Sequence, residues 1–512
     1  MNPNIQAAWE YHNLTKHSLS SLRLNQHSLD WSNQPRPYKE YTNLGPLPLP
    51  KDLPATNISA LSAMSILEVD RTAEAIPDLR TLASLLHFSA GITKWLQSAG
   101  GRMAFRAAAC TGALYHIELY VVCGDVPGLP AGVYHFGVHD GALRRLRSGD
   151  FRGTLVEATA EENSVLDAPV SVICTSTFWR NSWKYQSRTY RHSYWDNGTI
   201  LANMLTVATA HHLPARVVMG FVDDQLNHLL GVDGQREAVI SLVTLGHAPS
   251  MHPGSPGPVE TLNLETTPLS KGEIDYPSIR AIHSASSLSK PDEVSKWRLG
   301  ASLDSAGVSM ENLVPLRPIG PDEQPKDDIE TIIKRRGSSR GFRHDPVSFE
   351  SLSTAVDMAT LGIPTDFLHD SSYALNDLYL IANSVEGLEG GAYVFHPPEP
   401  GLELLKPGSF REEAGHLDLG QDLAGDASVN VYFMTDLNPI LERFGNRGYR
   451  IAQIEASIMA GKLYLGAYAL GLGATGLTFF DDDVTTFFAP HAQDKSVMFL
   501  LAVGIPSKHQ GV

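Results

Sequence analysis

The chain repeats itself at a constant spacing, and this repeat limits the folds open to it. The segment LPAGVYHF at Leu129 returns as LEGGAYVF at Leu388, 259 positions later (388 − 129). The same offset relates LRSGDFR at Leu146 to LKPGSFR at Leu405, DAPVSV at 167 to DASVNV at 426, and RTYR at 188 to RGYR at 447. One offset shared over more than a hundred residues predicts the duplication of a single domain.

Both copies show the same order of predicted elements. A helix is expected over 78–89 and over 347–360, because apolar residues recur there every three to four positions. β-rich segments follow at 117–122, 132–136 and 168–178, and at 376–381, 391–395 and 427–435. A long helix, apolar almost all round and therefore buried, is expected over 197–212 and 452–471, before a last strand at 238–246 and 497–504. Helices grouped around a mostly antiparallel sheet predict an α+β domain.

The repeat also suggests domain boundaries. Residues 1–60 read as an extended, Pro-rich N-terminal arm, 61–250 as copy one and 326–512 as copy two. Residues 251–325 are rich in Pro, Gly, Ser and charged residues, as in SMHPGSPGP, and read as a linker that wraps a surface. A docked helix within its segment DYPSIRAIHSAS remains open.

Composition narrows the class of protein. A formal charge of −16 disfavours a general nucleic-acid or anionic-membrane surface, since both need a broad basic face. The three cysteines at 110, 123 and 174 show no paired or CxxC spacing, which predicts neither a disulfide framework nor a cysteine zinc site. The N-terminus has no apolar signal core, and no run of about eighteen apolar residues occurs. We therefore expect a soluble, cytoplasmic protein.

One short segment concentrates positive charge in this acidic chain. KRRGSSRGF, residues 334–342, follows the helical pattern DDIETIIK, whose C-terminal dipole end is negative and cannot itself bind a phosphate. Guanidinium groups that fork onto oxygens, with two serine hydroxyls, are typical of an anion receptor. The alternative is a basic helix C-terminus placed favourably on its own dipole.

Several motifs resemble those of one family. IIKRRGSSRGFRHDPVSFESL resembles the opening signature of the nitroreductase superfamily of flavin enzymes. RAAACTGALYHIELYVV, LPAGVYHF and FWRNSWKYQSRTYRHSYWDNG are similar to the SagB/ThcOx-type dehydrogenases within it. The resemblance covers nearly the whole chain and implies an FMN enzyme whose two nitroreductase-like domains pair as an intramolecular pseudo-dimer.

The implied flavin motifs are divided between the copies. Copy two keeps the phosphate and ribityl receptor, and copy one has no such cluster near SILEVDRTAEA. Copy one keeps the loop that covers the flavin ring, with Ala109 and Cys110 where Pro-Ser is common, whereas 365–373 in copy two has lost its arginine and glycine. Glycines in GLGATGLTFF permit close backbone approach and positive φ, so an amide there is expected to contact the ring. The alternative is a helix C-cap followed by a buried strand. One competent site per chain follows, with these residues: Arg335, Arg336, Ser338, Ser339, Arg340, Arg106, Cys110, Thr111, Gly112, Ala113, Gly473, Ala474, Thr475, Gly476 and Leu477.

Lys184 and Tyr185 are the expected catalytic pair. Azoline dehydrogenases of the resembled family carry a Lys-Tyr pair at this position, and Arg443 and Phe444 replace it in copy two. A nearby ammonium is expected to lower the pKa of the tyrosine so that it acts as a base. The alternative is that Lys184 is solvated and Tyr185 packs in an aromatic cluster.

The reaction follows from the resemblance, and the substrate stays open. We expect a SagB-like dehydrogenase acting on a small molecule or peptide; the alternative is an NAD(P)H-dependent nitro or quinone reductase. A non-catalytic scaffold that keeps the fold is the rival from another class. The acidic run 481–483 reads as a helix N-terminus rather than a metal site. No metal is expected, and further association of chains is left open.

Overall fold

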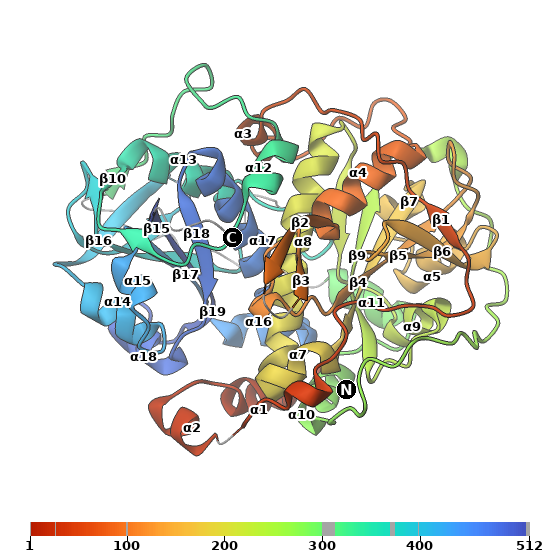
Figure 1. Cartoon of the computed structure of the whole chain (residues 1–512), viewed down its shortest axis with the longest axis horizontal. Coiled ribbons are helices and arrows are strands. Elements are labelled where there is room, and N and C mark those ends of the chain that lie inside the picture. The colour runs from red at the N-terminus through yellow and green to blue at the C-terminus, as the bar shows by residue number, and fades with distance from the viewer. Residues whose placement is uncertain are drawn as a thin grey trace.

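Two α+β domains lie side by side, with two long helices between their sheets (Figure 1). The computed structural model describes residues 2–25, 27–98, 101–299, 313–368, 374–397 and 399–507. Copy one supplies the domain drawn mainly in orange to green and copy two the one drawn in cyan to blue (Figure 1). The α+β class and the intramolecular pairing expected from the repeat are confirmed.

Each domain is built on one antiparallel sheet. Copy one contributes β1 (Pro46–Pro48), β4 (Ile117–Cys123), β5 (Gly132–Gly137), β6 (Ala142–Ser148), β7 (Val170–Thr177), β8 (Ala215–Val218) and β9 (Glu237–Leu245). Copy two contributes β10 (Leu313–Pro315), β11 (Phe342–Arg343), β13 (Asp377–Ala382), β15 (Gly391–His396), β16 (Gly401–Pro407), β17 (Val429–Thr435), β18 (Gly473–Leu477) and β19 (Ser496–Pro506).

The two sheets share one strand order. It is β1-β6-β5-β4-β7-β9-β8 in copy one and β10-β16-β15-β13-β17-β19-β11 in copy two, where β18 also pairs with β19 as β8 does with β9. Even the register shifts recur 259 residues apart, after Val133 and Ala392 and again after Cys174 and Phe433. The repeat in the sequence therefore extends to irregularities of the backbone.

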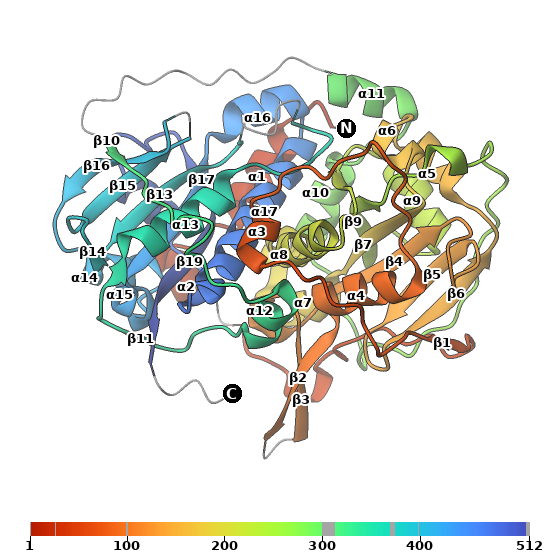
Figure 2. The ribbon, with the colours of Figure 1, turned by 90° about the horizontal axis from the view of Figure 1, so that it is seen from above.

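The paired helices α8 (Thr189–Ala210) and α17 (Arg447–Ala469) form the centre of the molecule (Figures 1 and 2). Nearly all of their residues are buried, as their all-round apolar pattern predicts. Small residues let them approach closely: a Cβ added at Gly198 would lie 1.9 Å from Ser457 Oγ, and one at Gly461 would lie 2.5 Å from Ala202 Cβ.

Reciprocal ion pairs lock the copies together. In copy one, α9 (Asp223–Leu230) begins with Asp223, which accepts from Arg447 (2.7 Å) and Arg450 (2.6 Å) of copy two. Asp481, at the start of α18 (Asp481–Phe487) in copy two, pairs in turn with two arginines of copy one, Arg188 (3.1 Å) and Arg191 (2.6 Å). All six side chains are buried. The acidic run at 481–483 thus opens a helix, as expected, and its first carboxylate joins the domains.

The remaining helices flank the sheets or end at the interface. α4 (Leu79–Ala90) and α13 (Phe349–Thr360) begin at side-chain caps from Asp78 and Ser348, close to the expected bounds. α7 (Phe178–Tyr185) and α16 (Leu437–Phe444) precede the two central helices. The others are α3 (Ala60–Met64), α5 (Arg152–Ala158), α6 (Asn163–Leu166), α12 (Ile329–Arg335), α14 (Arg411–Leu417) and α15 (Asp422–Asp426).

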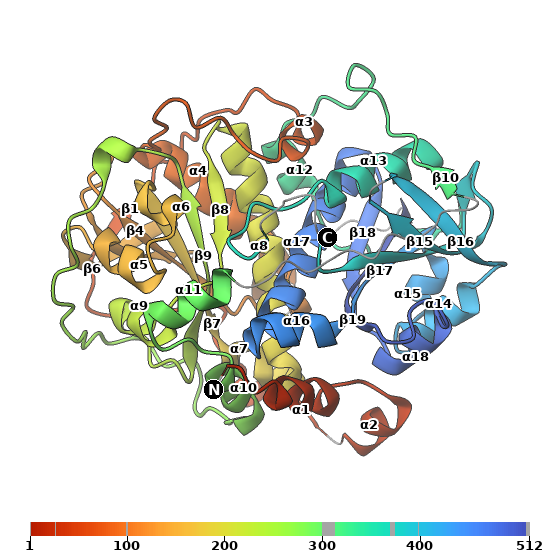
Figure 3. The same ribbon diagram turned by 180° about the vertical axis from the view of Figure 1, so that it is seen from behind.

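The N-terminal arm and the linker contain helices that wrap the interface. α1 (Gln6–Leu14) and α2 (Leu19–Leu24) correct the expectation of an extended arm. α1 folds because it buries Ala8 and Tyr11 against both copies, and a capping box at Ser18 starts α2. In the linker, α10 (Pro277–Ala285) lies in the segment where a docked helix was left open, and α11 (Pro291–Leu299) follows it. Figure 3 shows α1 and α10 side by side beneath α7.

One hairpin stands out from the body. β2 (Ile92–Ser98) and β3 (Gly101–Arg106) pair with each other and project outward (Figure 2). The chain leaves β3 directly into the loop predicted to cover a flavin ring. Within the described residues, no helix combines the length and apolar composition needed to cross a bilayer.

Candidate functional site

The arginine-serine segment follows α12 and lies against copy one. α12 ends at Arg335 with Arg336 as its C-cap, as the sequence predicts, so the negative end of the helix dipole faces this segment. Arg336 donates from Nε to the carbonyl of Ala107 (3.0 Å) and from Nη2 to the carbonyl of Arg106 (3.1 Å). Arg336 therefore ties the receptor segment of copy two to the loop of copy one.

The other two arginines have different surroundings. Arg335 pairs with Asp327 at 2.6 Å and is about half exposed. Arg340 is exposed and lies near enough to Tyr185 of copy one for its charge to oppose the rise in the pKa of that phenol. The structure thus brings Arg336 and Arg340 to the junction of the copies and leaves Arg335 in a surface ion pair.

The two serines face the body of copy two. Ser338 Oγ accepts a hydrogen bond from Tyr464 Oη on α17 (2.8 Å), and the Ser339 amide donates to the carbonyl of Ala474 on β18 (2.9 Å). Ser339 Oγ is buried and meets no hydrogen-bond partner among the described residues. A Cβ added at Gly473 would lie 2.4 Å from that hydroxyl, so only glycine lets the strand pass so close.

The strand β18 corrects one expectation about the glycine-rich segment. Of its glycines, Gly471 takes a positive φ (75°), whereas Gly473 and Gly476 lie in the strand without one. Close approach, not unusual backbone conformation, is thus what Gly473 provides. Thr475 is buried, and Gly476 and Leu477 end the strand at greater exposure.

The copy-one loop is held in a strained conformation. After Cys110, the residues Thr111–Ala113 form a short 3-10 turn, with φ of 61° at Gly112 and 54° at Ala113. A left-handed alanine costs about 1–3 kcal/mol unless the surroundings impose it. A Cβ at Gly112 would lie 2.6 Å from Tyr185 Oη, so this glycine is needed for both its φ and its close approach to the phenol.

Asp196 holds the loop in this conformation. This residue was not singled out from the sequence. Its carboxylate accepts from the Thr111 amide (2.8 Å) and hydroxyl (2.7 Å) and from Cys110 Sγ (3.0 Å), and it meets His116 Nε2 at 3.0 Å. Asp196 lies on α8 and is 4% exposed. A signal was present: Glu455 stands 259 positions later (455 − 196), so both buried helices carry an acid at the same place.

Arg106 is buried within copy one. Its Nη2 donates to the carbonyl of Pro37 in the N-terminal arm (2.6 Å), and its guanidinium lies 4.9 Å from the ring centroid of Tyr115. Its own carbonyl is the acceptor for Arg336. The side chain singled out in the sequence therefore anchors the loop, and its main chain is the part that meets copy two.

Lys184 and Tyr185 end α7 beside this loop. Lys184 is exposed, with Nζ 5.1 Å from the Tyr185 ring centroid. Burial raises the pKa of Tyr185 well above its usual value, and the charges of Asp196 and Cys110 raise it further. The expected lowering of the tyrosine pKa by the ammonium is therefore wrong, because burial of the phenol outweighs any nearby positive charge. Tyr185 stands at the junction as a protonated phenol.

Comparison with known proteins identifies the fold and the family. The model of the nitroreductase family matches residues 101–247 and 333–505, one segment in each copy and more than half of the chain together. A crystal structure of a nitroreductase-like protein from Anabaena variabilis ATCC 29413 superposes with a TM-score of 0.76 at 25% identity, covering 98% of this chain and 99% of that one.

Two curated relatives match shorter segments. A nitroreductase-like protein of Methanocaldococcus jannaschii is 25% identical over 154 residues, 30% of this chain and 74% of the relative. The trifolitoxin-processing protein TfxB of Rhizobium leguminosarum bv. trifolii is 35% identical over 140 residues, 26% of this chain, and the match spans only 36% of TfxB. With one family segment in each copy and a matching structure along nearly its whole length, the chain belongs to the nitroreductase family.

Proposed function

We propose that the chain is an FMN-dependent oxidoreductase with one flavin site, formed between the two copies. The main support is that the arginine-serine segment of copy two lies next to the strained loop and Tyr185 of copy one, at a single junction between the copies. Membership of the nitroreductase family supports an oxidoreductase. A non-catalytic scaffold protein would not need this concentration of anion-binding groups.

The residues present fit a phosphate-bearing cofactor. The unpartnered, buried Ser339 hydroxyl and the guanidiniums of Arg336 and Arg340 supply donors next to a strand that a Cβ would block. Arg336, Ser338, Ser339 and Arg340 would hold the phosphate and ribityl end, while the main chain at 110–113 and 473–477 would enclose the ring. FMN, when bound, supplies hydride transfer to or from a substrate.

Tyr185 would place a proton at the same junction. Because its pKa is raised, the phenol is protonated near neutral pH and acts as a hydrogen-bond donor or acid. Asp196 would act as a positioning residue, since it fixes the loop that carries Gly112 against the phenol oxygen. Lys184, exposed beside the ring of Tyr185, would be the group that meets incoming substrate.

For the substrate, we propose SagB-type dehydrogenation of a heterocycle in a small molecule or modified peptide. The motifs around Lys184 and Tyr185 support it, as does the similarity to TfxB, a protein that processes trifolitoxin. In such a reaction the substrate would lose a hydride, which FMN would take when bound, and a proton, which would pass to solvent water.

Reduction of a nitro compound or quinone with NAD(P)H is the second candidate. One observation favours it: a phenol held protonated by burial suits delivery of a proton to a reduced substrate better than removal of one. Wild-type turnover of the two substrate classes separates the two candidates, and Tyr185→Phe should slow the reaction that operates by at least about tenfold while FMN stays bound. Unchanged turnover of both substrate classes in Y185F would remove the phenol from either mechanism.

The flavin content of the purified chain tests the central proposal. We expect a yellow protein with an FMN-to-chain ratio near one. A colourless protein that FMN cannot reconstitute would contradict the enzyme, and a ratio near two would contradict the single site.

Arginine variants test the assigned receptor. Arg336→Ala combined with Arg340→Ala should abolish FMN retention in equilibrium dialysis, because both guanidiniums at the junction are lost. Arg343→Ala is the matched control, since Arg343 pairs with Asp345 at the surface about half exposed. Arg335→Ala should resemble this control, and FMN retention in the double variant would show that the receptor lies elsewhere.

A further inference from the structure

A hollow lies at the position that the pseudo-symmetry of the two copies relates to the proposed flavin site. The caps of α3 and α12, Ser59 and Asp328, pair with each other in a β-bridge across the interface. The two caps are 269 positions apart (328 − 59), and this local offset differs from the 259 of the rest of the repeat. With it, Arg335, Arg336 and Ser338 correspond to Ile66, Leu67 and Val69. These three apolar side chains line the hollow.

The rest of the wall follows the same correspondence. Leu205 and Thr209 of α8 stand 259 positions before Tyr464 and Tyr468 of α17, and Ala215 of β8 stands before Ala474. The centre of a water molecule can occupy about 20 Å³ of the hollow, which opens to solvent at its mouth. Copy one has thus replaced the anion receptor with an apolar wall while the space beneath it has stayed open.

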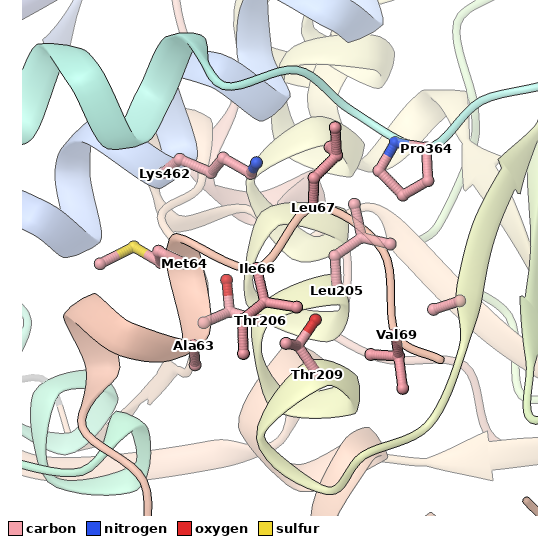
Figure 4. Close-up of a pocket in the computed structure, with 11 residues that line it drawn as sticks. Ala63, Met64, Ile66, Leu67, Val69, Leu205, Thr206, Thr209, Pro364 and Lys462 are labelled. Carbon is pink, nitrogen blue, oxygen red and sulfur yellow. The ribbon is translucent and has the colours of Figure 1, made fainter. Parts of the chain in front are cut away.

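Among the described residues that line this hollow, Lys462 is the one ionisable side chain, and it comes from α17 (Figure 4). It is 5% exposed, and its Nζ donates to the carbonyl of Gly362 (2.8 Å), the one acceptor it meets among the described residues. No carboxylate of the described residues lies within ion-pairing distance of it. Figure 4 shows the amine extended toward Leu67 and Pro364.

The fold does not require this charge. At the equivalent position of copy one, Asn203 donates its amide to the carbonyl of Phe88 (2.9 Å), so a neutral side chain makes the corresponding bond. Burial lowers the pKa of Lys462 to about 8, so the amine is still largely protonated at neutral pH. A buried cation with a neutral partner is costly, and an anionic ligand would offset that cost.

We propose that this hollow binds a short aliphatic monocarboxylate, with the carboxylate on the Lys462 ammonium and the alkyl part toward Ile66, Leu67, Val69 and Leu205. The small volume limits the ligand to an acid of about two or three carbons. This site goes beyond the proposed oxidoreductase function and does not depend on it, since none of its residues belongs to the flavin receptor.

Binding of fluoroacetate to the full-length protein, followed by fluorine NMR with and without added FMN, tests the proposal. We expect saturable binding to the wild type in the millimolar range or tighter. Binding should weaken at least about tenfold in Lys462→Gln, which keeps a donor for Gly362 without the charge, and persist in Lys462→Arg. The neutral probe 2-fluoroethanol should bind wild type and K462Q equally.

Further variants test whether the probe binds in this hollow and whether a loss of binding reflects misfolding of the variant. Thr209→Phe fills the hollow from α8 while it leaves Lys462 in place, and it should also abolish binding. Arg340→Ala, at the proposed flavin site, and Lys271→Met, at an exposed lysine, should leave binding unchanged. Above about pH 8 the affinity should fall as the ammonium loses its proton. Absent binding in the wild type, equal binding in K462Q, or loss of binding in R340A would overturn the proposal.

Discussion

Replacing Asp223 with Asn tests the reciprocal ion pairs that join the copies. The change keeps the volume but removes the negative charge between Arg447 and Arg450, which are both fully buried. Removing one partner of a buried ion pair leaves uncompensated charge and costs about 3–5 kcal/mol. Because Asp223 faces two guanidiniums from the other copy, we expect D223N to lose stability at the upper end of that range.

The pH dependence gives a second, independent magnitude. Burial alone would raise the pKa of Asp223, but Arg447 and Arg450 outweigh it and lower this pKa from 3.8 to about 2. A carboxyl whose pKa is lower in the folded state contributes stability that is present above about pH 4 and lost as the pH falls toward 2. The shift corresponds to about 2 kcal/mol, and D223N should lack this part of the acid dependence.

Urea unfolding followed by tryptophan fluorescence, at neutral pH and near pH 3, measures both effects. Asp482→Asn is the matched control, because Asp482 neighbours Asp481 but pairs with Lys16 at 73% exposure, where a loss below about 1 kcal/mol is expected. The symmetric variant Asp481→Asn should resemble D223N. A loss below about 1 kcal/mol in D223N, or equal losses in D223N and D482N, would refute the reasoning.

Three further changes test the loop, the strand and the second buried acid. Gly473→Ala, whose Cβ would lie 2.4 Å from Ser339 Oγ, should weaken FMN retention at least about tenfold in equilibrium dialysis, whereas Gly476→Ala, whose nearest contact would be 3.4 Å, should not. Asp196→Asn should cost about 2–3 kcal/mol in urea unfolding, because it leaves buried donors of the loop without a carboxylate. Burial raises the pKa of Glu455 from 4.5 to about 7, so the folded state holds this proton more tightly and wild-type stability should fall by about 3 kcal/mol as pH rises between these values. Glu455→Gln should remove that slope, and an unchanged slope would contradict the assignment.

The repeat made most of the fold predictable. The succession of helices and strands along each copy, the buried central helices and the end of α12 at Arg335 all follow from local pattern and from the comparison of one copy with the other. The arm was the exception, because a Pro-rich composition favours extended chain, whereas α1 gains its helical structure from burying Tyr11 against both copies. Tertiary burial of this kind leaves no local signal.

The approach of the arginine-serine segment to the copy-one loop was predictable from the sequence, but the contacts of each residue were not. The sequence cannot show that Arg335 has Asp327 within reach, or that burial raises the pKa of the Tyr185 phenol. Both outcomes depend on distances and burial in the folded chain. Asp196 escaped notice because a single acid in a helix reads as surface, and its burial becomes meaningful only with the loop folded over it.

The contacts at the pseudo-symmetry axis explain why the two copies pair with each other. Gly198 and Ser457 occupy equivalent positions of the repeat and face each other, and Ala202 and Gly461 do the same. In a dimer of identical copies each position would meet itself, so a serine at this crossing would face a serine. A Cβ opposite Ser457 would lie 1.9 Å from its hydroxyl, which in the fused chain instead donates to the carbonyl of Tyr194 (2.8 Å).

One glycine in each facing pair therefore makes room for the larger partner, a solution that only two unlike copies can adopt. Pairing copy two with another copy two would set serine against serine at the closest approach of the helices. The asymmetry that divides the proposed flavin-binding motifs between the copies thus extends to the core. Both halves of the proposed site are brought together because the packing of α8 on α17 favours unlike copies.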